Sequence, residues 1–130
     1  MTHTMRLQPA PFEMIKNGTK TIELRLFDDK RRKIRIGDTI VFISAGQYAE
    51  TLEVKVTGLF VFDSFAELYA ALPLLECGYT EEDIDTASPE DLDLYYSKEE
   101  QQKYGVVGIQ IIRSHSGNRE KASGAAGPAL

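Results

Sequence analysis

Residues 51–62, TLEVKVTGLFVF, alternate between apolar and polar side chains until Gly58, where the alternation changes phase. Alternation over this length predicts a half-buried β-strand, because successive side chains of a strand point to opposite faces of its sheet. A single glycine inside such a strand indicates a bulge or a sharp bend. The chain is therefore expected to contain a sheet that curves strongly near its middle.

Other segments favour further strands and short helices around this bend. Strands are expected at about 5–7, 20–27, 39–43 and 106–113, and 45–50 is expected to be a hairpin connection. Helices are expected at about 9–16, 64–72, 80–84, 88–96 and 97–104, each bounded by Pro, Gly, Ser or Thr at one end. Together these elements predict an α+β fold, a small mixed β-barrel with short helices at its rim.

One domain is expected, because 130 residues can bury one hydrophobic core but not two. The end of the chain lacks apolar periodicity and is rich in Gly, Ala and Ser, so we expect a domain over 1–113 and a flexible C-terminal tail over 114–130. No apolar run reaches the roughly 18 to 20 residues that span a membrane, and a signal-peptide pattern is missing. The single cysteine, Cys77, agrees with a reducing compartment. These features predict a soluble, cytoplasmic protein without a membrane partner.

Charge is distributed unevenly along a chain whose formal net charge is -5. Residues 16–35 hold eight basic and three acidic side chains, whereas residues 76–100 hold ten carboxylates and one lysine. A local basic stretch can bind phosphates although the whole protein is negative. It can equally be a solvated loop whose charges pair with Asp28 and Asp29.

Residues 18–25, GTKTIELR, place three charged side chains close together. Gly18 permits a tight exit from the preceding helix, so Lys20 is expected at the rim of a cleft. Glu23 and Arg25 share one face of a strand, and we expect that face to point outward. A guanidinium can hold a phosphate at two points, and a carboxylate can accept a hydrogen bond from the exocyclic amine of cytosine or adenine. The structural alternative is a simple surface ion pair.

The same segment fits the GxKxxExR signature of the ASCH domain (activating signal cointegrator homology). The chain resembles this family from about residue 5 to 113, through IGDTIVF and the closing YYSKEEQQKYGVVGIQI. The family is related to the PUA domain. The resemblance implies a small PUA-like β-barrel and, beside it, a cleft that is rimmed by the signature residues and suited to RNA or a modified nucleoside.

RNA binding is the leading hypothesis, with single-stranded RNA or a modified nucleoside as the partner. Unpaired bases stack on aromatic side chains, and Phe27, Tyr95, Tyr96 and Tyr104 are available, although an aromatic near strands more often packs in the core. Tyr95 and Tyr96 are adjacent, so at most one of them is expected in the core. The expected ligand-binding residues are Lys20, Glu23, Arg25, Lys30, Arg31, Arg32, Lys33, Tyr95 and Tyr104.

Two enzymatic alternatives follow from the resemblance. Some compact ASCH proteins are amidohydrolases that deacetylate N4-acetylcytidine; Lys20 occupies their lysine position, but Glu23 stands where they have a nucleophilic threonine. In such an enzyme Lys20 and Glu23 would be the catalytic residues, with Glu67 or Glu76 as the further carboxylate. Other family members cleave RNA, for which Lys20 would need a depressed pKa to act as a base and Arg25 would stabilise the developing charge.

A regulatory protein-interaction module is the third hypothesis, with the acidic residues 80–100 as its contact surface. A solvated face explains the same carboxylates. No cofactor or metal is expected, because His3 and His115 lie in the terminal segments and the sequence has no CxxC pair, calcium loop or phosphate-binding glycine loop.

Overall fold

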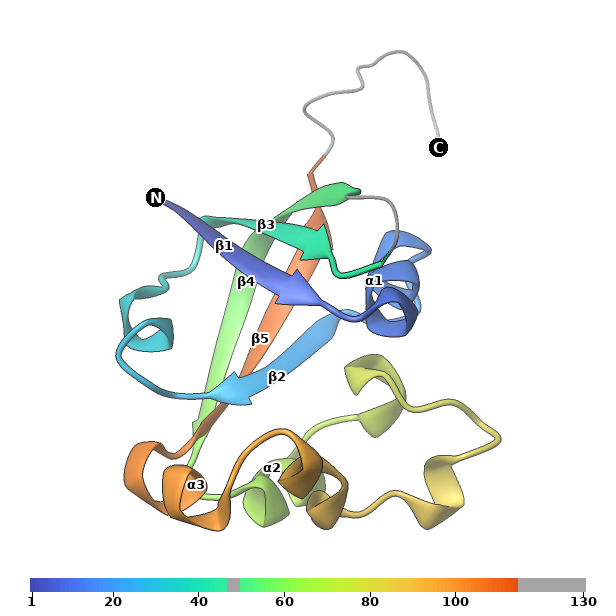
Figure 1. The fold of residues 1–130 in the computed structure, drawn as a ribbon, viewed down its shortest axis with the longest axis vertical. Coiled ribbons are helices and arrows are strands. Elements are labelled where there is room, and N and C mark those ends of the chain that lie inside the picture. The colour runs from blue at the N-terminus through green and yellow to red at the C-terminus, as the bar shows by residue number, and fades with distance from the viewer. Residues whose placement is uncertain (47–49, 115–130) are drawn as a thin grey trace.

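Five strands form one curled sheet in the computed structural model, which describes residues 1–46 and 50–114 (Figure 1). They are β1 (Thr2–Leu7), β2 (Ile22–Leu26), β3 (Thr39–Ser44), β4 (Thr51–Phe62) and β5 (Val106–Arg113). Their order across the sheet is β1-β3-β4-β5-β2, with β1 parallel to β3 and the other neighbours antiparallel. The expected α+β fold with a small mixed barrel is confirmed, as a half-barrel whose edges are β1 and β2.

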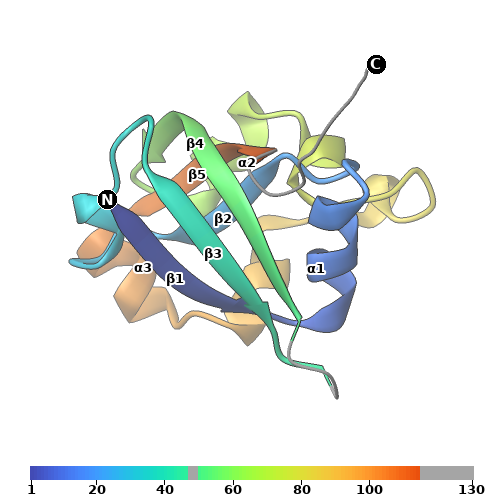
Figure 2. The ribbon, with the colours of Figure 1, turned by 90° about the horizontal axis from the view of Figure 1, so that it is seen from above.

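The bend in this sheet lies at Gly58, as expected. The pairing of β4 with β5 shifts register between Val56 and Gly58. A Cβ atom at Gly58 would lie 2.8 Å from Oε1 of Gln110 on the neighbouring strand, so this close approach excludes a side chain unless Gln110 moves. Figure 2 shows the curvature that follows from this bend. Strands β1, β3 and β4 lie in front and β5 and β2 lie behind them, so the sheet folds back on itself.

Helices and 3₁₀ turns surround the sheet. They are α1 (Pro9–Lys16), η1 (Arg31–Lys33), α2 (Phe65–Ala71), η2 (Leu74–Cys77), η3 (Ile84–Thr86), η4 (Pro89–Leu94) and α3 (Lys98–Tyr104). The expected helices at 9–16, 64–72 and 97–104 are confirmed. The expected helices at 80–84 and 88–96 are wrong: the first is a turn that leads into η3, and the second is η4. Their backbone hydrogen bonds include ones from residue i+3 to residue i, as from Asp91 to Ser88, which is 3₁₀ and not α geometry. None of the helices in the described ranges has the length and apolar character needed to cross a membrane.

Two groups of buried side chains form the core. The larger lies inside the curl of the sheet and includes Met5, Phe12, Ile40, Phe42 and Val54. The smaller lies between β2 and α2 and includes Ile22, Leu24, Phe65, Leu68 and Val106. Residues 74–97, which we call the arm, connect α2 to α3 and pack against this second group through Leu74, Leu92 and Tyr96.

Two expectations fall on residues outside the described part of the chain. The connection expected at 45–50 includes residues 47–49, and all but the first residue of the expected tail lies in 115–130. The described part of the chain ends at Ser114, whose backbone N–H donates to the carbonyl of Glu53.

Candidate functional site

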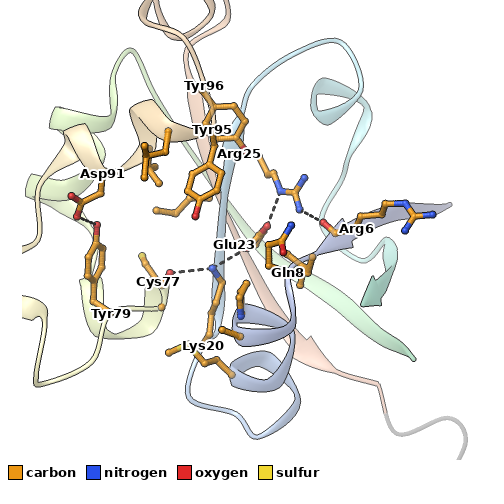
Figure 3. A pocket seen from close by; sticks show the side chains of 18 of the residues that line it. Arg6, Gln8, Lys20, Glu23, Arg25, Cys77, Tyr79, Asp91, Tyr95 and Tyr96 are labelled. Carbon is orange, nitrogen blue, oxygen red and sulfur yellow. Dashed lines mark hydrogen bonds and ion pairs between the residues drawn. The ribbon is translucent and has the colours of Figure 1, made fainter. Parts of the chain in front are cut away.

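A pocket of about 680 Å³ lies where both edge strands meet α1 and the arm (Figure 3). This volume is in the range of small-molecule sites. Parts of the chain that are far apart in sequence line it. They are Arg6, Leu7 and Gln8 at the end of β1, Ala10, Pro11 and Met14 of α1, Lys20, Glu23, Leu24 and Arg25 of the signature, Ala45, Tyr69, and Cys77, Gly78, Tyr79, Asp91, Leu92, Leu94, Tyr95 and Tyr96 of the arm.

The three signature side chains form an ion cluster in this pocket. Lys20 Nζ lies 2.9 Å from Oε1 of Glu23, and Nε of Arg25 lies 2.7 Å from Oε2. Glu23 therefore receives a cation on each carboxylate oxygen. Its residue exposure is only 4%, and that of Lys20 is 8%. The structure brings together the residues that the signature predicted, but in a buried cluster.

The expectation that Glu23 points outward, with Lys20 at a rim, is wrong. Strand β2 is covered on both faces, because the arm folds over the face that carries Glu23. Lys20 Nζ also donates to the carbonyl of Cys77 in the arm, at 3.1 Å. The alternation of the strand was recognised correctly, but the exposure of its polar face depends on a segment more than 50 residues away.

The backbone after α1 directs Lys20 inward. Gly18 has a φ of +89°, which a residue with a side chain rarely adopts, and ends the helix. The N–H groups of Thr19 and Lys20 then both donate to the carbonyl of Met14. The next N–H, of Thr21, donates to the carbonyl of Glu76. This short connection is fixed at both ends, so the lysine enters the pocket with a defined direction.

The electrostatics of the cluster keep Glu23 ionised. Burial alone would raise the pKa of Glu23, but the charges of Lys20 and Arg25 outweigh it and hold the pKa below its ordinary value. Burial alone would also lower the pKa of Arg25, and the Glu23 carboxylate reverses that effect. The pocket therefore contains a buried carboxylate between two cations.

Arg25 also connects the two edges of the half-barrel. Its terminal nitrogen NH2 donates to the carbonyl of Arg6 on β1, at 2.9 Å. Because β1 and β2 lie at opposite ends of the strand order, this side chain bridges edges that are not neighbours in the sheet. One residue thus belongs both to the ion cluster and to the junction of β1 with β2.

A second polar group, which the sequence did not reveal, lies on the opposite side of the pocket. Tyr69 and Tyr79 are joined through their hydroxyl oxygens at 2.6 Å, and the Tyr79 hydroxyl donates to Oδ2 of Asp91 at 2.7 Å. Burial and these two hydrogen bonds raise the pKa of Tyr79. No spacing in the sequence links these residues, and only the capping box of Ser88 with Asp91 was a local signal.

The adjacent tyrosines of the arm separate as expected. Tyr96 stacks on Phe65, with ring centroids 6.0 Å apart, and thereby joins the second core group. Tyr95 is 66% exposed and lines the pocket, so its ring is available for stacking. Tyr104 does not line the pocket, and the ring of Phe27 is covered by the guanidinium of Arg32 at 4.3 Å.

Residues 30–33, which we call the basic turn, lie outside the pocket lining. Lys30 Nζ donates to the carbonyl of Thr4, and Arg31 forms an ion pair with Asp28 at 3.1 Å. Arg32 donates to the carbonyl of Tyr104. Three of the four cations therefore have partners within the protein, whereas the exposed side chain of Lys33 forms no hydrogen bond or ion pair with the described residues.

The carboxylates proposed to complete an amidohydrolase site also lie elsewhere. Glu67 is in the first turn of α2 and accepts from the N–H of Asp63, and Glu76 accepts from the hydroxyl of Thr21. Neither lines the pocket, whereas Asp91 does. Within residues 1–46 and 50–114, no group of three His, Cys, Asp or Glu side chains is arranged to hold a metal ion.

Comparisons with known structures support the fold. The chain is 36% identical to the hypothetical protein PH0355, whose crystal structure matches with a TM-score of 0.72 over 88% of this chain and 100% of that chain. It is 34% identical to protein PF0455 from Pyrococcus furiosus, with a TM-score of 0.63 over 87% and 97%. A mutant of ZmASCH from Zymomonas mobilis matches with a TM-score of 0.61 over 85% and 67%, and its 12% identity shows likeness of fold alone.

The sequence itself matches one family model. Residues 5–114 match the ASCH domain, a range that includes the whole pocket and every described strand, apart from the first residues of β1. No curated protein sequence matches the chain. The chain belongs to the ASCH domain family, with a PUA-like half-barrel fold and the general association of that family with RNA binding.

Proposed function

We propose that this domain binds single-stranded RNA or a modified nucleoside by holding one base in the pocket. The family supports RNA as the class of partner. The observation that carries the proposal is Glu23, a carboxylate that is held ionised between Lys20 and Arg25 and yet lines a pocket of about 680 Å³. Removing such charges from water is costly, and well-packed apolar side chains are often as stabilising. A role in recognition would explain why charged side chains, and not apolar ones, occupy this buried place.

The remaining hydrogen-bonding capacity of the cluster suits the edge of a base. Each Glu23 oxygen accepts one bond from a cation and has a second lone pair. Lys20 has three N–H donors and uses two, to Glu23 and to the carbonyl of Cys77. An exocyclic amine could donate to Glu23 while a ring nitrogen or carbonyl accepts from Lys20 or Arg25.

Stacking on Tyr95 would add a second contact between the base and the pocket. Tyr95 is the exposed aromatic of the pocket, and a base that stacks on an aromatic ring gains about 1 to 3 kcal/mol. Because Tyr95 and Glu23 come from the arm and from β2, one ligand could contact both sides of the pocket. The arm would then bind one face of the base while the ion cluster reads its edge.

The test compares three variants on cytidine-rich and uridine-rich oligomers. Glu23→Gln is expected to lose preference among bases, by about 1 to 3 kcal/mol for the preferred one, because the amide exchanges acceptor capacity for a donor. Arg25→Ala should weaken all ligands together. Glu76→Gln is the matched control, because Glu76 is exposed and outside the pocket lining.

Two outcomes would contradict the proposal. A uniform loss of affinity in Glu23→Gln, with base preference intact, would assign Glu23 a purely structural role. Unaltered binding in both Glu23→Gln and Arg25→Ala would place the ligand elsewhere. Circular dichroism of each variant, recorded first, restricts the comparison to folded protein.

Hydrolysis of a nucleoside or of RNA is a second candidate function. It is favoured by the presence of Lys20, Glu23 and a second carboxylate, Asp91, in one pocket. Two features favour binding over catalysis. Glu23 occupies the place that the resemblance gives to a threonine nucleophile, and both of its oxygens already accept from cations.

Some acidic residues of the arm have local structural partners, which weakens the case for a protein-interaction surface. Asp83 accepts from the N–H of Thr80, and Asp91 accepts from the N–H of Ser88. Such contacts fix turns and helix starts. Asp83 and Asp91 thus have a structural role that needs no partner protein.

A further inference from the structure

The outer edge of β1 is covered by cationic side chains. The carbonyl of Thr4 accepts from Lys30, at 2.8 Å, and the carbonyl of Arg6 accepts from Arg25, at 2.9 Å. Thr4 and Arg6 are two residues apart, so both carbonyls leave the strand on the same side, away from β3. Cations from β2 and from the basic turn therefore follow this edge in a row.

Arg6 adds a guanidinium to the same region. Arg6 borders the pocket, and its exposed side chain extends outward from the opening, away from Glu23 and Lys20 (Figure 3). Among residues 1–46 and 50–114, no ion pair or hydrogen bond to this side chain is found. In Figure 3, Arg6 and Gln8 lie at one end of the pocket and Tyr79 and Asp91 at the other. The opening beside β1 thus carries an exposed guanidinium, whereas the opposite end of the pocket carries the carboxylate of Asp91.

The basic turn lies beside the same edge of β1. Arg25 donates to the carbonyl of Arg6 from within the pocket. Lys30 of the basic turn donates to the carbonyl of Thr4, two residues earlier on this edge. These two contacts therefore lead along β1 from the pocket to the basic turn.

We infer that Arg6 holds a phosphate of the ligand, and that an RNA strand leaves the pocket along the edge of β1 toward the basic turn. This inference rests on the proposed base-binding function and extends it, because it assigns the ligand class as a nucleotide and gives its direction. A guanidinium binds two phosphate oxygens at once. The carboxylate of Asp91 repels a phosphate, so the phosphate is expected at the opening near Arg6 and not at the Asp91 end of the pocket.

The experiment measures the affinity gained from one phosphate. Calorimetric titrations compare the four nucleosides with their 5′- and 3′-monophosphates. The wild-type domain is expected to bind one monophosphate about tenfold more tightly than its nucleoside, as one charge-assisted hydrogen-bonded pair provides. Arg6→Gln should abolish this ratio and leave nucleoside affinity within about twofold, because Arg25 bonds to the backbone of Arg6 and that bond is kept.

A charge-matched control and a longer ligand complete the design. Lys55→Gln makes the same change of charge on β4, outside the pocket lining, and should keep the tenfold ratio. For a short oligonucleotide, Lys30→Gln should lower the slope of log affinity against log salt by about one, as expected when one phosphate is no longer neutralised. An unchanged slope would contradict the path to the basic turn.

The outcomes separate this inference from the proposed function. Nucleoside binding with a tenfold ratio that survives Arg6→Gln would overturn the phosphate position and leave the base pocket standing. An equal loss for nucleosides and nucleotides in Arg6→Gln would assign Arg6 to the base or sugar and would also overturn it. Failure of every nucleoside and nucleotide to bind the wild-type domain would overturn both proposals.

Discussion

The Nζ atom of Lys20 lies 2.9 Å from Oε1 of Glu23, and both side chains are more than nine-tenths buried. Buried charges of this kind depend on each other, because removing one leaves the other without compensation in a poorly solvated place. Arg25 binds the other oxygen of the same carboxylate. Stability and ligand recognition therefore involve the same atoms, and experiments on the pocket must measure both.

Stability should depend on pH through Glu23. Its pKa in the folded protein lies below its ordinary value of 4.5, so the folded state favours the ionised form. This contribution is complete above pH 4.5 and is lost as the pH falls through the lower folded-state pKa. Urea unfolding from pH 7 to pH 3 should show a steeper loss in wild type than in Glu23→Gln, which is less stable by ~3 to 5 kcal/mol at pH 7.

The quantity to compare is the difference in unfolding free energy between wild type and Glu23→Gln at each pH. Asp38 and Asp93 also have lowered pKa values, through hydrogen bonds from His3 and Gln101 respectively, and contribute equally to both proteins. Their effect cancels in the subtraction. Parallel curves for wild type and Glu23→Gln would show that Glu23 is not ionised in the cluster.

Lys20→Ala should destabilise the fold, although lysine is usually a surface residue. The ammonium bonds to Glu23 and to the carbonyl of Cys77 inside the protein, so its loss leaves a carboxylate with one cation fewer. We expect a loss of ~3 to 5 kcal/mol by urea unfolding at pH 7. Lys33→Ala, at an exposed position, should cost less than ~0.5 kcal/mol. Equal stability of the two variants would place Lys20 at the surface after all.

The basic turn should contribute to RNA affinity without sequence preference. Lys30 and Lys33 are exposed, and Lys30→Gln combined with Lys33→Gln removes two charges without breaking the Arg31 ion pair. Filter binding at several salt concentrations should show weaker binding to all sequences and a salt slope lower by about one for each phosphate that the variant no longer neutralises. Identical affinity and slope would exclude the turn from the RNA path.

Incubation with N4-acetylcytidine should release little or no acetate. Glu23 stands where the resemblance gives the amidohydrolases a threonine, and its oxygens are each bound to a cation, which reduces their nucleophilicity. Chromatography of the nucleoside after incubation provides the measurement. Efficient conversion to cytidine, abolished by Lys20→Met, would establish the hydrolase function instead.

Local elements were predictable because their signals are local. Ser64 and Ser97 accept from the N–H three residues on and begin α2 and α3, as hydroxyl caps at these positions suggest. The bulge near Gly58 follows from one glycine in a strand pattern. Lys20, Glu23 and Arg25 could be assigned to one site because they lie within six residues.

The rest of the site depends on contacts between distant segments. Glu23 is buried only because the arm covers β2, and strand periodicity carries no information about a covering segment. Tyr69, Tyr79 and Asp91 meet across more than 20 residues of chain. Arg6 reaches the pocket because the half-barrel brings its two edge strands to one opening. These relations require the folded topology.

The cations on the outer edge of β1 also affect how this domain behaves toward other copies of itself. An edge strand with free carbonyls is a template on which a further strand can add, and this is a common start of aggregation. Lys30 and Arg25 occupy the carbonyls of Thr4 and Arg6, and they place charge where an incoming strand would have to lie. The open half-barrel thereby keeps this edge closed to intermolecular strand pairing, without the backbone hydrogen bonds of a complete barrel.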